Sequence, residues 1–352
     1  MTRLDSGPDA STGLSTGAFE DAPALCDGPR ALVLESREVP LGGVRGMAVH
    51  RALPQRDLPM VGAWCFLDRF GPQRARMRVE PHPHIGLQTV TWPFTGDVRH
   101  RDSVGSDVFV RRGALNLMTS GRGISHSEYS IGEDEVKLDA LQLWVALPES
   151  RRHGGPAFEQ HAQLPQLHIA ATRTAEVIGA SEDRGSSEDF AAHAVVVMGE
   201  FAGVVSPASA YTPIVGAEVR VSPGTRVRLP LKPEWEYALL AVDGDISADA
   251  DAAASALSWQ IGDLLYLGIS RDHIDVTSAS GATVFVLGGE PFPDEIVMWW
   301  NFVGRDHDEI VEAREEWEGS SERFGQVIDH GDERIPAPPL PAVRLTPRRR
   351  RA

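Results

Sequence analysis

Short runs of aliphatic and β-branched residues, each ended by Gly, Pro or Asp, follow one another along the chain from residue 31 onward. In the first half these runs include 60–68, 89–92 and 141–145. Runs of this length with turn residues between them are typical of antiparallel sandwiches and barrels. The pattern therefore predicts an all-β fold.

A second block of short apolar runs, including 194–198 and 237–242, follows a looser and more polar stretch. It repeats the rhythm of the first block, in which a strand, a Gly-Asp turn and another strand succeed one another. This repetition predicts a duplicated β-barrel. We expect an N-terminal barrel over 29–190 and a C-terminal barrel over 191–320.

The two ends of the chain differ from these blocks. Residues 1–28 are rich in Ser, Gly, Asp, Ala and Pro and lack apolar periodicity, which predicts a disordered leader. Strong helix formers over 308–317 predict one short C-terminal helix. Proline and arginine dominate 321–352, where we expect a flexible, extended tail.

The charge balance is acidic, because 34 Lys and Arg stand against 50 Asp and Glu and leave a formal net charge of -16. A protein of this sign repels phosphate groups, so we expect no direct contact with nucleic acid. We interpret the run Arg348–Arg351 as a solvated tail. No stretch resembles a membrane span or a secretory signal, and we therefore expect a cytoplasmic protein without a membrane anchor.

The two cysteines lie in very different surroundings. Cys26 belongs to the polar leader, whereas Cys65 lies inside the apolar run 61–67. This arrangement predicts no disulfide and fits a reducing compartment. We expect Cys65 to be a core residue of a strand and not a reactive thiol.

Two short motifs carry residues suited to metal binding. His82 and His84 are separated by one residue, and the same spacing separates His126 from Glu128. In a strand this spacing places both side chains on one face. Two such strands facing each other inside a barrel could bring three imidazoles and a carboxylate to one point. That donor set suits divalent iron, manganese, copper, nickel or zinc, so the motifs predict a mononuclear metal site.

The segments around these motifs resemble those of the pirins, a branch of the cupin superfamily. The similarity lies in Pro81–Thr91, His100–Gly105, Met118–Glu128 and Gly288–Arg305, and it extends over roughly residues 30–320.

The resemblance implies a bicupin, that is, two double-stranded β-helix barrels with the metal in the N-terminal one. It implies that His82, His84, His126 and Glu128 hold this metal, which is most often iron as Fe(II), with manganese, copper, nickel, cobalt or zinc as alternatives. The C-terminal barrel offers only the isolated His273, and we expect it to be free of metal.

The chain departs from the pirin pattern at two positions. Gln88 stands where the family usually has Glu, and Ile85 stands where it usually has Arg. General cupins draw their carboxylate ligand from about the position of Gln88, whereas pirins draw it from the position of Glu128. The resemblance therefore implies that the site survives the change at Gln88.

Several neighbouring residues have a structural interpretation. We expect His100 to be a surface histidine in preference to one that lies behind the metal ligands. The turn 121–123 is expected to shape the entry into the strand of His126. Trp299 and Trp300 are expected to pack against the barrels, rather than to form a stacking platform.

Four protein ligands around a six-coordinate metal leave two adjacent positions open, which suits a reaction between a substrate and dioxygen. Pirins include quercetin 2,3-dioxygenases, and the resemblance implies a small aromatic substrate such as a flavonol, with Glu128 accepting its hydroxyl proton. Pirins also include regulators that bind a transcription factor or a metabolic enzyme, with the iron as a redox sensor. A metal protein with another small-molecule substrate is a third interpretation, and the residues leave these alternatives open.

Overall fold

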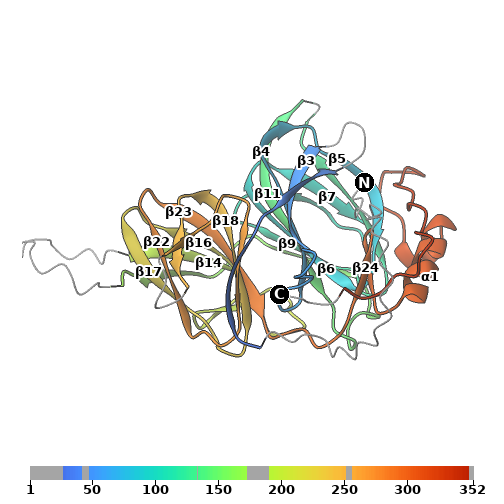
Figure 1. Cartoon of the computed structure of the whole chain (residues 1–352). Coiled ribbons are helices and arrows are strands. Elements are labelled where there is room, and N and C mark those ends of the chain that lie inside the picture. The colour runs from blue at the N-terminus through green and yellow to red at the C-terminus, as the bar shows by residue number, and fades with distance from the viewer. Residues whose placement is uncertain (1–26, 42–46, 133, 173–189, 251–255, 349–352) are drawn as a thin grey trace, which may run out of the picture.

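The computed structural model describes residues 27–41, 47–132, 134–172, 190–250 and 256–348. Over these residues it contains 25 strands, one α-helix and one short 3-10 turn (Figure 1). The leader through Cys26 and the arginines after Arg348 lie outside the described residues.

The N-terminal unit consists of two antiparallel sheets. The larger sheet contains, in spatial order, β12 (Ala157–His161), β9 (Leu115–Thr119), β6 (Leu87–Thr95), β11 (Val136–Ala146), β4 (Trp64–Ala75), β3 (Met47–Leu53) and β2 (Arg37–Leu41). The smaller sheet contains β5 (Arg78–His84), β10 (Ile124–Ser130), β7 (Val98–Asp102) and β8 (Asp107–Val110). An apolar cluster that includes Phe70, Val79 and Val98 draws on both sheets and holds them together.

The C-terminal unit repeats this arrangement. Its larger sheet contains β1 (Pro29–Leu34), β21 (Leu264–Gly268), β18 (Glu236–Gly244), β23 (Ala282–Gly289), β16 (Ile214–Val221), β14 (Phe190–Phe201) and β13 (Gln166–Ala170), with β15 (Val204–Val205) paired to β14. Its smaller sheet contains β17 (Thr225–Pro230), β22 (His273–Ser278), β19 (Ser247–Asp249) and β20 (Leu257–Ser258). The all-β, two-cupin fold class is thereby confirmed, although each unit has two separate hydrogen-bonded sheets and its barrel is not closed by one continuous ladder.

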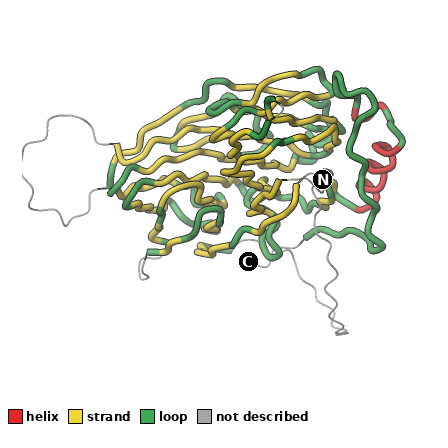
Figure 2. The backbone as a smooth tube through the Cα atoms, turned by 90° about the horizontal axis from the view of Figure 1, so that it is seen from above, coloured by secondary structure: helices red, strands yellow, loops and turns green. Residues whose placement is uncertain are grey.

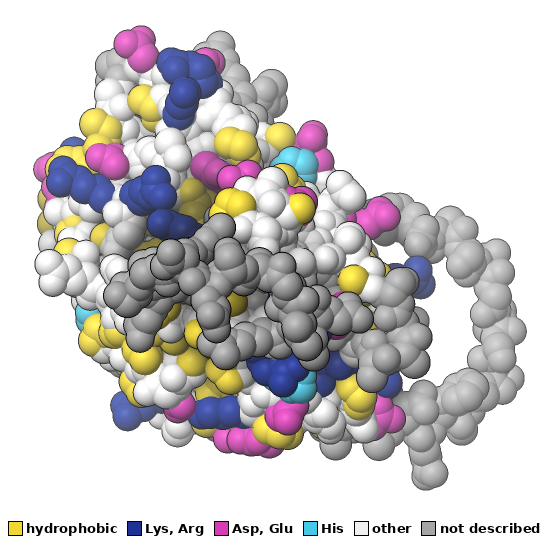
Figure 3. Space-filling view, turned by 90° about the vertical axis from the view of Figure 1, so that its left-hand side faces the viewer, with side chains coloured by type: hydrophobic (Ala, Val, Ile, Leu, Met, Phe, Trp, Pro, Cys, Tyr) yellow, Lys and Arg dark blue, Asp and Glu magenta, His cyan; other side chains and the backbone are white. Residues whose placement is uncertain are grey.

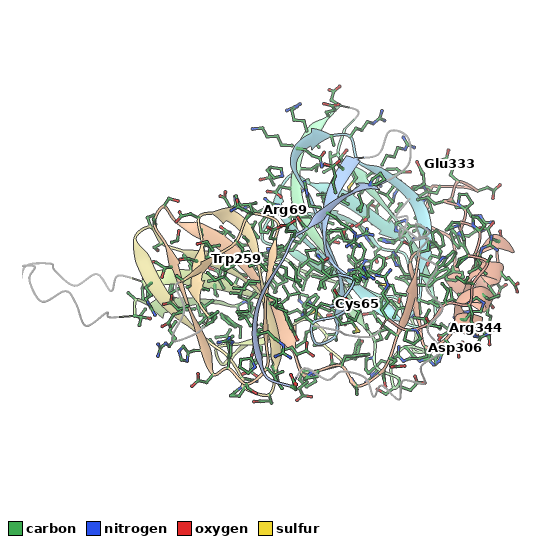
Figure 4. All side chains as sticks on the ribbon, in the orientation of Figure 1. Cys65, Arg69, Trp259, Asp306, Glu333 and Arg344 are labelled. Carbon is green, nitrogen blue, oxygen red and sulfur yellow. The ribbon has the colours of Figure 1, made fainter. Side chains whose placement is uncertain are left out.

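One apolar cluster contains residues from the larger sheets of both units, so these two sheets pack on each other. The first seven residues of β4 and of β6 are all buried. Burial on both faces explains why these strands read as unbroken apolar runs without alternation. Arg69 lies at this boundary (Figure 4), where its guanidinium binds Asp139 and donates to the carbonyl of Val242 at 2.6 Å.

Both ends of the described chain cross to the other unit. Strand β1 pairs with β21 of the C-terminal unit, although we expect residues 29–190 to belong to the N-terminal barrel. In the opposite direction, β24 (Val297–Trp299), β25 (Phe302–Gly304), α1 (His307–Glu318) and η1 (Glu322–Phe324) cover the N-terminal unit. Figures 1 and 2 show α1 at the end of the molecule formed by that unit. The two units are therefore intertwined at both ends of the chain.

Helix α1 confirms the predicted C-terminal helix. The Asp306 side chain caps it by accepting from the backbone N–H of Glu309 at 3.0 Å. Ile310, Ala313 and Trp317 are buried, and their spacing of three and four residues places them on one face of the helix.

The segment after α1 is extended, and its described part is packed where we expect a flexible tail. The backbone N–H of Ile335 donates to the carbonyl of Pro81 at 2.8 Å, and Trp317 Nε1 donates to the carbonyl of Ile335 at 2.9 Å. Ala337 is buried in the cluster that also contains Phe324. These apolar contacts anchor the proline-rich chain, which its composition alone does not reveal.

Charged side chains of both signs are interspersed on the face shown in Figure 3. Within the described residues, no helix is long and apolar enough to cross a membrane.

Candidate metal centre

Strands β5 and β10 place the two predicted motifs side by side. The strands are antiparallel hydrogen-bonded neighbours in the smaller sheet, and His126 lies opposite His82. They are thus adjacent in one sheet and do not face each other across a barrel. A β-bulge in β5, where Glu80 and Pro81 together lie opposite Ser127, shifts the register, so that Glu128 lies opposite Val79. Bulges of this kind re-aim side chains next to functional sites.

The three histidines of the motifs converge. One ring nitrogen of each of His82, His84 and His126 lies within 4.8 Å of the others, and all three side chains are buried. The Nε2 atoms of His84 and His126 are only 3.1 Å apart. The structure therefore brings together three of the four predicted ligands through nitrogen atoms.

Backbone carbonyls orient two of these rings. His82 Nδ1 lies 2.9 Å from the carbonyl of Glu80, and His84 Nδ1 lies 3.1 Å from the carbonyl of Asn301. A carbonyl only accepts, so both Nδ1 atoms carry the hydrogen and both Nε2 atoms present a lone pair. Both lone pairs are thus available to a metal ion.

Burial also keeps the imidazoles uncharged at neutral pH. It lowers the pKa of His82 to about 4, and it lowers the pKa of His84 and of His126 well below the ordinary value. Neighbouring imidazoles contribute to the lowering, because one positive charge disfavours another. Neutral nitrogens are the form that binds metals.

Glu128 lies beside this group but is not one of its three members. Its carboxylate groups with ring nitrogens of His126 and His100 within 4.8 Å, and it lines the same cavity as the three histidines. Burial raises its pKa. Gln88 lies elsewhere, since its amide donates to Thr119 Oγ1 at 3.0 Å and to the carbonyl of Ser209.

The interpretation of His100 as a surface histidine is wrong. Its relative exposure is 3%, and its ring stacks on Phe158 with a centroid distance of 4.6 Å. Its Nδ1 lies 3.3 Å from His126 Nδ1, and its Nε2 lies 3.0 Å from Asp102 Oδ2. Strand β7, which carries both residues, is the second neighbour of β10, and this pairing buries His100.

A largely apolar cavity lies over the histidines. Its volume is about 50 Å³. The rings of Phe66 and Trp144 stack at 4.0 Å in its wall, and Asp68 in the wall forms a buried two-bond ion pair with Arg51. The cavity is lined by Val49, Phe66, Asp68, Phe70, Met77, Val79, His82, His84, His126, Glu128, Gln142, Trp144, Trp300, Asn301 and Ile335.

Three of these lining residues come from the C-terminal segment that crosses to the N-terminal unit. Trp300 packs edge to face on Phe302 at 5.3 Å, as expected for a packing residue, but it also lines the cavity together with Asn301. Ile335 adds an apolar wall from beyond α1. The sequence contains no signal for these contacts, because more than 200 residues separate Asn301 from its partner His84.

The turn before β10 requires glycine. Gly121 has a φ of +50°, and a Cβ atom there would lie 2.2 Å from the carbonyl oxygen of Gly154.

Cys65 is fully buried in the core, and burial raises the pKa of its thiol to about 12, so it is not a reactive thiol.

The donor geometry fits a metal ion. Two nitrogens that each lie about 2.1 Å from one metal, at right angles, are separated by about 3 Å, which agrees with the 3.1 Å between the Nε2 atoms of His84 and His126. Lone pairs that point at one another without a cation between them would repel.

Within the described residues, the groupings of three or more possible ligands do not include His273 of the C-terminal unit.

Comparisons with known proteins agree with this arrangement. The Pirin family matches residues 46–145, and the Pirin C-terminal cupin domain matches residues 216–325. A Pseudomonas aeruginosa protein named "putative quercetin 2,3-dioxygenase" is 38% identical over 310 residues, which cover 87% of this chain and 89% of that protein. A pirin-like protein of Caulobacter vibrioides is 32% identical, over 87% of this chain and 99% of its own length.

A solved structure agrees as well. The crystal structure of quercetin 2,3-dioxygenase from Acinetobacter baumannii superimposes with a TM-score of 0.77 at 36% identity, over 90% of this chain and 97% of that one. The paired cupin domains, the histidine cluster and these matches together show that the chain belongs to the pirin family.

Proposed function

We propose that this chain is a mononuclear metalloprotein in which His82, His84, His126 and Glu128 hold divalent iron, and that it catalyses the dioxygen-dependent ring opening of a flavonol. The observation that carries the proposal is the convergence of three buried, neutral imidazoles beneath an apolar cavity that also contains a carboxylate. The names of the similar proteins from Pseudomonas and Acinetobacter support the substrate class.

The bound metal would supply a Lewis-acidic, redox-active centre with open coordination positions for substrate and dioxygen. Glu128 would accept the proton of the flavonol 3-hydroxyl. Burial raises its pKa and so makes it a stronger base than an exposed glutamate. The stacked rings of Phe66 and Trp144 offer a flat apolar wall for an aromatic substrate.

The size of the cavity limits how a flavonol can bind. Pockets for drug-sized ligands usually measure roughly 300–1,000 Å³, whereas this cavity measures about 50 Å³. We therefore expect only the 3-hydroxyl edge of the flavonol to enter the cavity, with the rest of the molecule at its mouth against the C-terminal segment that carries Ile335.

The test combines metal analysis with an activity assay. Freshly purified protein is analysed for metal, loaded with Fe(II) to one equivalent, and mixed with quercetin while oxygen consumption and the flavonol absorption band are followed. We expect turnover, its abolition by His126→Ala, and its retention by His273→Ala in the C-terminal unit. Absence of turnover across a panel of flavonoids, with one equivalent of metal verified, would refute the enzymatic function.

A further inference from the structure

We propose that His100 and Asp102 act as positioning residues that fix the tautomer of His126, so that its Nε2 lone pair faces the metal position. This inference rests on the proposed metal centre and adds two residues to it. His82 and His84 obtain the same tautomer from backbone carbonyls. His126 instead obtains it through a chain of two side chains on β7.

The Asp102 carboxylate is the fixed end of this chain. Its Oδ1 accepts hydrogen bonds from the backbone N–H groups of Val104 at 3.0 Å and Ser106 at 2.9 Å. The residue is fully buried, so its side chain has no room to exchange these bonds for water. Only Oδ2 is left to face His100 Nε2, at 3.0 Å.

This carboxylate determines which nitrogen of His100 carries the hydrogen. An ionised carboxylate only accepts, and therefore His100 Nε2 must donate. A neutral imidazole has a single ring hydrogen, so His100 Nδ1 presents a lone pair. Stacking on Phe158, at a centroid distance of 4.6 Å, holds the ring in this orientation.

The lone pair of His100 in turn determines the tautomer of His126. The two Nδ1 atoms are 3.3 Å apart, and the acceptor role of His100 makes His126 Nδ1 the donor. The hydrogen of His126 is thus on Nδ1, and its Nε2 presents a lone pair 3.1 Å from Nε2 of His84. The three histidines then share one tautomer. Their lone pairs point toward one another, an arrangement that a bound cation stabilises.

Asp102→Asn should reverse the chain of hydrogen bonds. The amide oxygen is expected to keep the two backbone donors, so the amide nitrogen replaces Oδ2 and donates to His100 Nε2. His100 then carries its hydrogen on Nδ1 and donates to His126 Nδ1. The hydrogen of His126 moves to Nε2, where it blocks the metal. Changes behind a metal-bound histidine typically lower metal affinity by about 10- to 100-fold.

The experiment measures tautomer and affinity separately. Long-range nitrogen–proton NMR of the metal-free protein reports which nitrogen of His126 is protonated, and chelator competition with Ni(II) reports the dissociation constant. The matched control is Asp107→Asn on β8, which alters the exposed ion pair of Asp107 with Arg99 on β7. His100→Gln should restore affinity in the Asp102→Asn background, because the Gln carbonyl oxygen can accept from His126 Nδ1.

We expect Asp102→Asn to place the hydrogen of His126 on Nε2 and to weaken Ni(II) binding about 10- to 100-fold, while Asp107→Asn changes neither. An unchanged His126 tautomer together with wild-type Ni(II) affinity would overturn the inference. Failure of the proposed function looks different, since flavonol turnover would be absent in the wild type while the shift in tautomer persists. If the wild type binds no Ni(II), the NMR measurement alone decides.

Discussion

Burial of the histidines of the candidate metal centre should make the metal-free protein sensitive to mild acid. His82 has its pKa lowered to about 4 by burial, whereas the same imidazole in an unfolded chain titrates near 6.5. Between these two values the unfolded chain binds a proton that the native protein does not. The stabilisation is therefore complete above pH 6.5 and is lost as the pH falls toward 4.

The size of the effect follows from the pKa difference. Each pKa unit corresponds to about 1.4 kcal/mol, so the shift of His82 from 6.5 to about 4 corresponds to a loss of about 3 kcal/mol in the free energy of unfolding. This loss is large against the roughly 5–15 kcal/mol that stabilises a typical domain. His84 and His126 shift in the same direction and add to it.

Urea unfolding of the metal-free protein between pH 7.5 and 4 measures this loss. His82→Gln is the comparison, because its amide does not titrate, and the difference between the two pH profiles isolates His82. We expect the wild type to lose about 3 kcal/mol more than the variant by pH 4. Parallel pH profiles for the two proteins would refute the reasoning.

Three further changes test other parts of the structure. Arg51→Met leaves Asp68 buried without its ion partner and should lower the free energy of unfolding, measured in urea, by about 3–5 kcal/mol. Adding Asp68→Leu should restore most of this loss, and a loss below about 1 kcal/mol in the single variant would contradict the reasoning. Ile335→Ala removes apolar contact at the cavity mouth and should weaken quercetin binding to the Ni(II)-loaded protein about tenfold while leaving catechol binding unchanged, as absorbance titration would show. Trp92→Phe removes the 2.7 Å hydrogen bond to buried Glu218 between the two units and should cost about 1–3 kcal/mol by the same urea measurement.

The pairs of candidate ligands were predictable because their signal is local. In a strand, residues i and i+2 share a face whatever the rest of the chain does, so His82 with His84, and His126 with Glu128, could be paired from spacing alone. The helix over 308–317 was predictable for a similar reason, since its capping residue and buried face lie within a few turns. The runs of apolar residues likewise predicted the strands of both units.

His100 shows where local reasoning fails. Alternation places it with Asp102 on one face of β7, but it does not say which face becomes buried. Burial depends on β10, which pairs with β7 and brings His126 against the ring. From the sequence alone, a polar residue on a strand is predicted to be exposed. Its burial can be recognised only when the residues that pack against it are known.

The sequence by itself determined the all-β class, the duplicated organisation and the residue pairs that form the candidate centre, because strand periodicity and turn chemistry act over a few residues. Only the tertiary structure decided how β5, β7 and β10 bring these residues together and which residues enclose them. Asn301 and Ile335 join the site because the C-terminal segment packs its apolar residues on the N-terminal unit. Such contacts arise from burial of apolar surface between distant segments, which spacing along the chain does not encode.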